Sequence, residues 1–321
     1  MEKRILTKDR VIEFMAKYSI YFIMLLMIII CSFLNPKFLT QTNMTNILRQ
    51  ICVYALLAFG ESILLISGNI DLAAGSTVAF VSCASVYVYL WSGSLLLSII
   101  AAILLGALVN FVSGLFTVYF RIPGFIATLG MQSAVRGLAL LITKGTNITD
   151  IDKGFKVLGQ GEIFGLPISI LVMFFCAFLL WVLLERTRLG RNFYAIGGNK
   201  EAARASGINI NRSVLLSFVL SGCFIGLAAV VYASRINAGM PASAVGYEST
   251  GLTSAIIGGV GFAGGTGSAW GIIIGALVLG IINNILNLLG IPSYIQNVVY
   301  GLLIVAAVGL DTLTRTCRVS R

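Results

Sequence analysis

Long apolar runs separated by short polar connections recur along almost the whole chain, and they restrict the fold more than any other feature. Hydrophobic residues make up 58% of the 321 positions and charged residues only 11%, whereas soluble domains are about 45–50% apolar and about 25% charged. A membrane-spanning helix needs about 20 mainly apolar residues. We therefore expect an all-α, polytopic integral membrane protein of about ten transmembrane helices in a single domain, residues 1–321. The expected spans are 18–34, 47–66, 71–90, 94–120, 122–142, 167–184, 213–233, 250–263, 269–289 and 293–310.

The residue inventory excludes most enzyme classes. Histidine is absent, which removes His general bases, Ser-His-Asp triads and His-containing zinc sites. The six cysteines are scattered without a C-x-x-C pair, so neither a disulfide framework nor a metal cluster is indicated. No P-loop sequence occurs, and the G-x-G-x-x-G pattern that starts at Gly259 joins two apolar segments instead of following a strand. The sequence therefore predicts a protein that is not an enzyme, without a catalytic residue, metal site or cofactor of its own.

The positive charges predict the orientation of the chain in the membrane. The net charge is +10, and because membrane proteins retain Lys and Arg on the cytoplasmic side, no nucleic-acid partner is needed to explain it. Most of these cations fall in alternate connections, which places both termini in the cytoplasm. Residues 1–17 are expected to form a cytoplasmic interfacial segment, residues 143–166 an outer loop and residues 185–212 a cytoplasmic loop.

Two polar interruptions of apolar sequence predict broken helices. Residues 67–76 contain Asn69 and Asp71, and a charge near mid-bilayer costs about 2.5–3.5 kcal/mol on insertion scales, so it usually faces protein or water. These residues either line a transport path or simply cap the following helix, whose positive end favours a carboxylate. A second, glycine-rich interruption at 258–271 lies in the other half of the chain. Paired interruptions of this kind are typical of transporters whose path runs between two halves.

Further polar residues lie inside the expected spans. Glu61 is in the second span, and Asn283 and Asn287 share one face of the ninth through their i, i+4 spacing. Amides that face a cavity suit the hydroxyl groups of a sugar, and the alternative is that they form hydrogen bonds between helices. Two small-residue spacings predict close helix packing: Gly222-x-x-x-Gly226 and Gly271-x-x-x-Gly275.

The most informative polar stretch is residues 187–210. Asn199 is a good N-cap, Glu201 falls in a first helical turn, and Gly207 suits the position just after a helix end. The helix between them has about two turns, which is too short to persist alone in water. It must therefore dock on a surface, either that of a partner or that of the protein's own helices or lipid headgroups. Its small-residue face consists of Ala202, Ala203 and Ser206.

At this stretch the chain resembles a known family. Residues 201–207, EAARASG, are similar to the EAA-type loop of ATP-binding-cassette importer permeases, whose short helix inserts into a cleft of a separate ATPase subunit. From about residue 35 to 311 the chain resembles the sugar-importing branch of these permeases, the ribose, xylose, galactose and autoinducer-2 class, and most closely its ribose members. Two residues depart from the family's pattern: Ala73 stands where Ser is usual, and Thr266 stands where Lys is frequent. These departures concern the identity of the sugar and not the fold. The segments that carry the resemblance are GNIDLAAGS at 68–76, PGFIATLGM at 123–131, GRNFYAIGGNKEAARASGIN at 190–209, GYE at 246–248, GGVGFAGGTGS at 258–268 and NNILNLLGIPSYIQ at 283–296.

The resemblance implies a ten-helix permease with broken helices that acts as a homodimer in the bacterial cytoplasmic membrane. It implies import of a ribose-like monosaccharide, delivered by an extracytoplasmic binding protein and driven by an ATPase subunit. The residues assigned to ATPase coupling are Asn199, Lys200, Glu201, Ala202, Ala203 and Gly207. The residues assigned to the translocation path are Asn69, Asp71, Asn283 and Asn287. Two alternatives stay open: the same architecture moving autoinducer-2, a nucleoside or a branched-chain amino acid, or an ion-driven secondary transporter in which Asp71 and Glu61 couple the ion.

Overall fold

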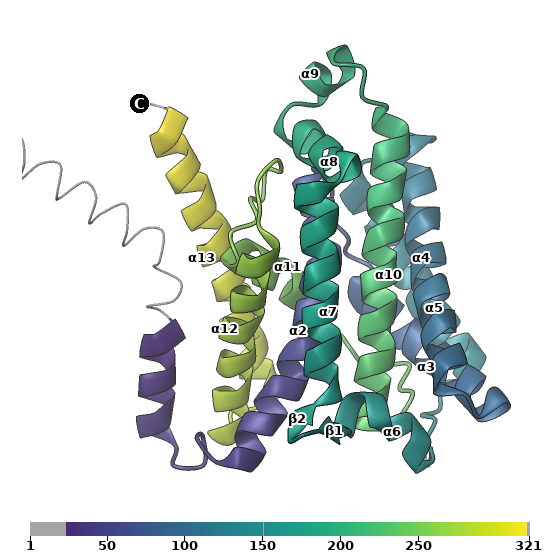
Figure 1. Ribbon diagram of the computed structural model, residues 1–321, viewed down its shortest axis with the longest axis vertical. Helices are drawn as coiled ribbons and strands as arrows, with labels where there is room; N and C mark the ends of the chain where they lie inside the picture. The colour runs from purple at the N-terminus through teal and green to yellow at the C-terminus, as the bar shows by residue number, and fades with distance from the viewer. Residues whose placement is uncertain (1–23, 150, 320–321) are drawn as a thin grey trace, which may run out of the picture.

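The structure, a computed structural model, describes residues 24–149 and 151–319, so the expected interfacial segment 1–17 lies outside the described residues. The described part is a bundle of helices with one short antiparallel hairpin (Figure 1). The hairpin consists of β1 (Glu162–Ile163) and β2 (Leu166–Pro167). The helices are, in chain order, Met24–Leu34, α2 (Gln41–Ile66), α3 (Ala74–Ser92), α4 (Leu95–Val118), α5 (Gly124–Thr143), α6 (Lys153–Gln160), α7 (Ile168–Trp181) with the π-helical turn η1 (Val182–Arg186), α8 (Arg188–Gly198), α9 (Lys200–Ala205), α10 (Ile210–Ile236), α11 (Tyr247–Ile257), α12 (Ala269–Leu288) and α13 (Ser293–Val319).

These helices confirm the predicted all-α, polytopic membrane fold. Seven of the described helices are long and apolar enough to cross a membrane, namely α2, α3, α4, α5, α7 with η1, α10 and α12. The apolar helix Met24–Leu34 and the apolar part of α13, Ser293–Gly309, are shorter stretches. The predicted span 250–263 is not one helix, because α11 has 11 residues and ends at Ile257. Such a helix is about 16 Å long, half of a hydrocarbon core of about 30 Å, so a count of ten complete spans is not confirmed.

Helix α2 lies at the centre of the bundle. Every residue from Ile51 to Ile66 is buried, and α2 contacts α7, α10, α11 and α12. A helix that is apolar on all sides is most stable when other helices surround it. The burial of α2 therefore follows from its sequence, with Glu61 as the charged exception within the buried stretch.

Glycines allow the close packing that the small-residue spacings predict. An added Cβ atom on Gly222 would lie 2.8 Å from the carbonyl carbon of Gly106, so α10 and α4 touch through their backbones. Gly275 of α12 lies against the end of α11 in the same way, because its added Cβ would be 2.7 Å from the nitrogen of Gly258. Any side chain at these positions would push the helices apart.

The polar connections lie at two opposite ends of the bundle. Helix α6 and the β-hairpin are at one end, and α8 and α9 are at the other (Figure 1). Helix α13 runs toward the end that carries α9. The expected outer loop, 143–166, and the expected cytoplasmic loop, 185–212, are thus separated by the thickness of the bundle. The assignment of each end to a side of the membrane stays a prediction from charge.

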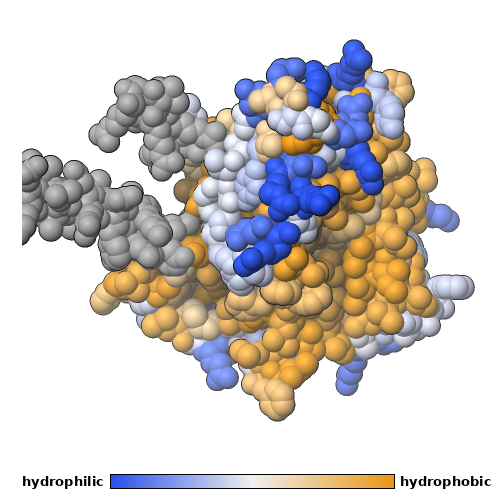
Figure 2. All heavy atoms as spheres, turned by 45° about the horizontal axis from the view of Figure 1, so that its top comes forward, coloured by the Kyte–Doolittle hydropathy of each residue, from blue (hydrophilic) through white to orange (hydrophobic). Residues whose placement is uncertain are grey.

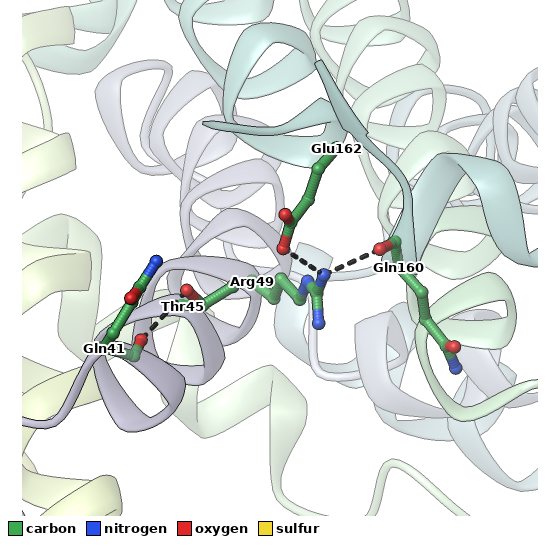
Figure 3. A network of polar contacts seen from close by, with 5 residues as sticks. All are labelled: Gln41, Thr45, Arg49, Gln160 and Glu162. Carbon is green, nitrogen blue, oxygen red and sulfur yellow. Dashed lines mark hydrogen bonds and ion pairs between the residues drawn. The ribbon is translucent and has the colours of Figure 1, made fainter. Parts of the chain in front are cut away.

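Arg49 holds the α6 end to the central helix (Figure 3). Its Nη2 donates hydrogen bonds to the carbonyl oxygen of Gln160 at 2.6 Å and to Oε1 of Glu162 at 2.9 Å. In the same view, the hydroxyl of Thr45 donates to the carbonyl oxygen of Gln41 at 3.0 Å within the first turns of α2. The segment between α5 and α7 is therefore fixed on α2 by charged and backbone contacts.

Candidate functional site

The short helix predicted in residues 187–210 is present as α9. Oδ1 of Asn199 accepts a hydrogen bond from the backbone N–H of Ala202 at 3.0 Å, which makes Asn199 the N-cap. Helix α9 ends at Ala205 with Ser206 as its C-cap, and Gly207 follows with a φ of 81°, in the left-handed region that favours glycine. Beyond it, the N–H of Ile208 bonds back to the carbonyl oxygen of Ala203 at 3.1 Å. Both predicted ends of the helix are confirmed.

One face of α9 docks on the protein itself. Ala203 is 3% exposed. It packs in a small apolar cluster with Leu64, Ile196, Ile210, Val214 and Phe218, which belong to α2, α8 and α10. The opposite face, with Lys200, Glu201 and Ala202, is exposed. This docking explains how so short a helix is stable, and it leaves one face free for a partner. Among the residues assigned to coupling, Ala203 is therefore a packing residue, whereas the others lie at the surface.

Three backbone segments meet beside the end of α2, and we call Ile66, Gly197 and Gly265 the backbone junction. The N–H of Gly265 donates to the carbonyl oxygen of Ile66 at 3.0 Å. Gly197, near the end of α8, lies against both, because an added Cβ atom would be 2.6 Å from the nitrogen of Gly265 and 2.9 Å from the carbonyl carbon of Ile66. The hydroxyl of Tyr194 also donates to the carbonyl oxygen of Gly267 at 2.9 Å. The two predicted interruptions therefore converge on the predicted coupling segment.

Asp71 organises the first interruption. It is fully buried, and its Oδ1 accepts a hydrogen bond from the N–H of Ala73 at 2.7 Å. Its Oδ2 accepts from Nδ2 of Asn110 in α4 at 3.0 Å. Because α3 begins at Ala74, Asp71 fixes the turn that precedes the helix without being its N-cap residue. The carboxylate thus combines the local role predicted for a capping residue with a contact to another helix.

Two further acids interact electrostatically with Asp71. Glu61 of α2 is fully buried, and neither of its carboxylate oxygens has a hydrogen-bond partner among the described residues. Glu248, in the first turn of α11, accepts a hydrogen bond from the N–H of Gly246 at 3.2 Å, and its Oε2 has no partner in the same part of the chain. Buried carboxyl groups without partners are costly. The bundle interior therefore holds polar groups that apolar packing does not explain.

Two residues of α5 that the sequence did not single out fix the first interruption and the loop before α11. The hydroxyl of Thr128 accepts a hydrogen bond from the N–H of Leu72 at 3.1 Å. Nη1 of Arg136 donates to the carbonyl oxygens of Pro241 at 2.8 Å and Ser243 at 2.6 Å, in the loop before α11. A lone cation inside an expected span was a usable signal for Arg136. The sequence holds no comparable local signal for Thr128.

Asn283 and Asn287 of α12 lie near the other end of α2. Oδ1 of Asn283 accepts hydrogen bonds from Nε2 of Gln50 at 2.5 Å and from Nδ2 of Asn287 at 2.9 Å. Gln296 of α13 donates to Oδ1 of Asn287 at 3.0 Å. We call these four residues the amide network; it joins three helices, which is the packing alternative considered from the sequence. Gln50 is about 24 Å along α2 from Ile66, so the structure does not bring the four path residues together.

A cavity of about 1280 Å³ opens beside α9. Its walls are the connection after α2, the turn between α4 and α5, and the segment from the end of α8 to the start of α10. Asn69 lines this cavity together with Asn199 and Lys200, so one residue assigned to the path shares a surface with two assigned to coupling. Asp71, in contrast, is enclosed by protein and does not line the cavity.

Known proteins place the chain in a family. Residues 43–308 match the family described as branched-chain amino acid transport system / permease component. The ribose import permease protein of Escherichia coli is 36% identical over 292 residues, which are 90% of this chain and 91% of the relative. The ribose import permease protein of Bacillus subtilis is 36% identical over 299 residues, 92% of this chain and 93% of its own. The D-allose transport system permease protein of Escherichia coli is 36% identical over 302 residues, 94% and 93% of the two chains. No solved structure matches the chain.

These matches cover most of the chain and fit its apolar helices. A helical bundle with this many membrane-length helices is the architecture that a permease requires. The chain therefore belongs to the family of branched-chain amino acid transport system permease components and is a multi-pass membrane permease, a transporter and not an enzyme.

Proposed function

We propose that this chain is the permease subunit of an ATP-binding-cassette importer that moves a ribose-like monosaccharide across the bacterial cytoplasmic membrane. The relatives named for ribose and D-allose support this substrate class. In this proposal an extracytoplasmic binding protein delivers the sugar, a separate ATPase subunit hydrolyses ATP, and a second copy of the permease completes the path. Both termini and α9 face the cytoplasm, and residues 1–321 act as a single domain surrounded by lipid.

The observation that carries the proposal is the position of α9. Its exposed face, with Glu201 and Ala202, is free for the ATPase subunit. Its buried face packs through Ala203 on Leu64 of α2 and Phe218 of α10. A partner that moves the exposed face must therefore also move the ends of α2 and α10. The backbone junction carries the same displacement to the second interruption, so the movement reaches the helices around the path.

We assign the path from its polar groups. Asn69 lines the cavity beside α9, and Asp71 fixes the backbone next to it, which supports a role for both on the cytoplasmic side. Asn283 and Asn287 belong to the amide network at the other end of α2, which supports a role on the outer side. Amide groups, which supply the donors and acceptors that a sugar requires, are present at both ends. The solute itself, whether a pentose, autoinducer-2, a nucleoside or a branched-chain amino acid, is tested by a ligand screen of the binding protein.

The decisive experiment places a bulky side chain on the free face of α9. Ala202→Arg should leave the helix intact, because Arg is a good helix former, and should block insertion into a partner cleft. We expect the ATPase subunit to be lost from the purified complex and uptake to stop. Ala242→Arg is the matched control, since Ala242 is an exposed alanine in the loop between α10 and α11, away from α9. Retention of the ATPase by Ala202→Arg at the control level would refute the coupling assignment.

One observation favours an ion-driven transporter as the second candidate. Glu61 is a fully buried acid that interacts electrostatically with Asp71, and buried carboxyl groups inside a membrane bundle are the kind of group that couples an ion. Proteoliposomes separate the candidates, because an ATP-binding-cassette importer needs ATP and its ATPase subunit whereas a secondary transporter needs only an ion gradient. Uptake by the permease alone under a proton or sodium gradient, lost in Glu61→Gln, would establish the second candidate and reject the first.

A further inference from the structure

The cavity beside α9 is lined by cations and by no acid. Arg121, Lys200 and Arg204 contribute to its wall, and none of its lining residues is Asp or Glu. Arg204 is paired with Glu201 at 2.9 Å. Arg121 and Lys200 form no ion pair within residues 24–149 and 151–319. Figure 2 shows hydrophilic side chains gathered on this end of the molecule, above apolar flanks. The cavity therefore has a positive potential that the described part of the protein does not neutralise.

The backbone at Arg121 is held in an unusual conformation. Its φ is 57°, in the left-handed region that is uncommon for residues other than glycine, and Arg121 lies in the turn between α4 and α5. The following N–H, that of Ile122, bonds back to the carbonyl oxygen of Phe116 at 3.3 Å, which closes the turn. This conformation costs roughly 1 kcal/mol or more for a residue with a side chain. Strained residues often mark functional positions, and here the turn sets a free guanidinium group at the wall of the cavity.

The first turn of α5 adds backbone donors to the same wall. Pro123 occupies the N-cap position and offers no side-chain cap, and the N–H groups of Gly124 and Phe125 have no acceptor among the described residues. Helix α5 has 20 residues, so its N-terminus carries the positive end of a full helix dipole. Free N–H groups at a helix N-terminus commonly bind anions. Gly124 and Phe125 line the same cavity as Arg121 and follow it closely in the sequence.

We propose that this cavity binds a phosphate group, with Arg121, Lys200 and the first turn of α5 as its contacts. Phosphate fits because Arg can bind it with two parallel hydrogen bonds, and Lys and backbone N–H groups bind the remaining oxygens. Two sources carry such a group: the headgroup of an anionic phospholipid and a soluble phosphate ester. The phospholipid is favoured, because Tyr119 and Phe125 also line the cavity and are 68% and 52% exposed, which provides an apolar surface next to the cations.

The test uses the full-length permease alone, in nanodiscs of phosphatidylcholine. A ligand that binds the folded state raises the Tm, so thermal unfolding is followed while either phosphatidylglycerol in the disc or inorganic phosphate in the buffer is increased. We expect phosphatidylglycerol to raise the Tm of the wild type. Arg121→Gln should need about tenfold more of the probe for the same rise, since about 1.4 kcal/mol corresponds to one decade of affinity. Lys200→Gln, on a different element, should weaken the response in the same direction.

Arg188→Gln is the matched control. It removes the same charge from an exposed position of α8 at the same end of the bundle, outside the residues that line the cavity. We expect its response to stay within about twofold of the wild type. A response to inorganic phosphate that depends on Arg121 would support the phosphate site and identify a soluble ester as its source. The proposal is overturned if neither probe raises the Tm, or if Arg188→Gln weakens the response as much as Arg121→Gln. Because the assay contains neither an ATPase nor a sugar, its result is independent of the proposed transport function.

Discussion

Replacing Gly197 by Ala should separate the segments of the backbone junction. The added methyl group would lie 2.6 Å from the nitrogen of Gly265 and 2.9 Å from the carbonyl carbon of Ile66, and closer still to the carbonyl oxygen. Ordinary contacts of a Cβ atom are 3.4 Å or longer. The segments must therefore move apart by roughly 1 Å or more, since protein interiors leave no free space for the methyl group. This movement disrupts the hydrogen bond between Gly265 and Ile66, which is 3.0 Å long in the structure.

The expected cost combines two effects. Forcing an extra methyl group into a packed site costs about 1–3 kcal/mol. Ile66 is 0% exposed, so water does not readily replace the lost donor, and a buried backbone group without a partner costs a further ~1–3 kcal/mol. We expect Gly197→Ala to lower the free energy of unfolding by about 2–6 kcal/mol, against a typical total of about 5–15 kcal/mol. The variant should therefore fold, with a lower Tm.

Gly198→Ala is the matched control. The two glycines are neighbours at the end of α8, but nothing lies within 4 Å of the Cβ atom that Gly198→Ala would add. Thermal unfolding of the purified permease tests stability, and ATP hydrolysis with sugar uptake in proteoliposomes tests coupling. We expect Gly197→Ala to lose uptake while the assembled complex still hydrolyses ATP, and Gly198→Ala to match the wild type. If both variants unfold and transport alike, the close contact at Gly197 does not connect the three segments.

Three further predictions address orientation, the first interruption and the expected outer loop. Single cysteines at Asn147 and Lys200, in a background without the native cysteines, should differ in labelling: an impermeant maleimide added to intact cells should reach position 147 only, and labelling of 200 alone would invert the topology. Asp71→Leu should reduce uptake while the complex still assembles, because the N–H of Ala73 and Nδ2 of Asn110 lose their acceptor, at a cost of about 1–3 kcal/mol for each unpaired donor. Asp71→Asn should be milder. Normal uptake by both variants would remove Asp71 from the path. The hydroxyl of Tyr89 donates a hydrogen bond to Asp152 and lowers the pKa of that carboxyl group in the folded state. The contact therefore stabilises the fold at a pH above about 3.9, the pKa of Asp in the unfolded state. This stabilisation is lost as the pH falls through the lower pKa of the folded state. Tyr89→Phe should therefore reduce the decrease in Tm between pH 6 and pH 3, and an unchanged decrease would show that the bond does not couple to folding.

Features set by neighbouring residues were predicted correctly from the sequence. The N-cap at Asn199 and the glycine that follows the end of α9, Gly207, depend only on residues within one helical turn. Both can therefore be predicted from the neighbouring sequence. The apolar runs locate the helices because lipid requires helical hydrogen bonding wherever the chain spans it. Close contact at Gly222 also followed from spacing, since a small-residue repeat leaves a flat helix face wherever its partner lies.

Features that depend on residues distant in the sequence were not predicted correctly. The expected span 250–263 overlapped the glycine-rich interruption predicted at 258–271, and in the structure the interruption prevails: α11 stops at Ile257, and the glycine-rich segment after it packs against α8 and α2. Ala203 was assigned to ATPase coupling together with Ala202, although three other helices of the protein bury it. The four path residues were assigned together from polarity alone, which carries no information about the length of α2 that separates Asn69 from Asn283.

Helix α2 gives this separation a mechanical meaning. Its 26 residues span about 39 Å, and the half that is buried on every side cannot bend freely into a neighbour. One end is bonded through Ile66 to Gly265, and the other part is bonded through Gln50 to Asn283. A displacement of α9 that shifts Leu64 therefore acts on α2 as a whole and changes the position of Gln50 relative to α12. The hydrogen bonds of the amide network are worth only about 0.5–1.5 kcal/mol each. Such bonds are strong enough to define a resting arrangement of α2, α12 and α13, and weak enough for a driven movement of α2 to break them.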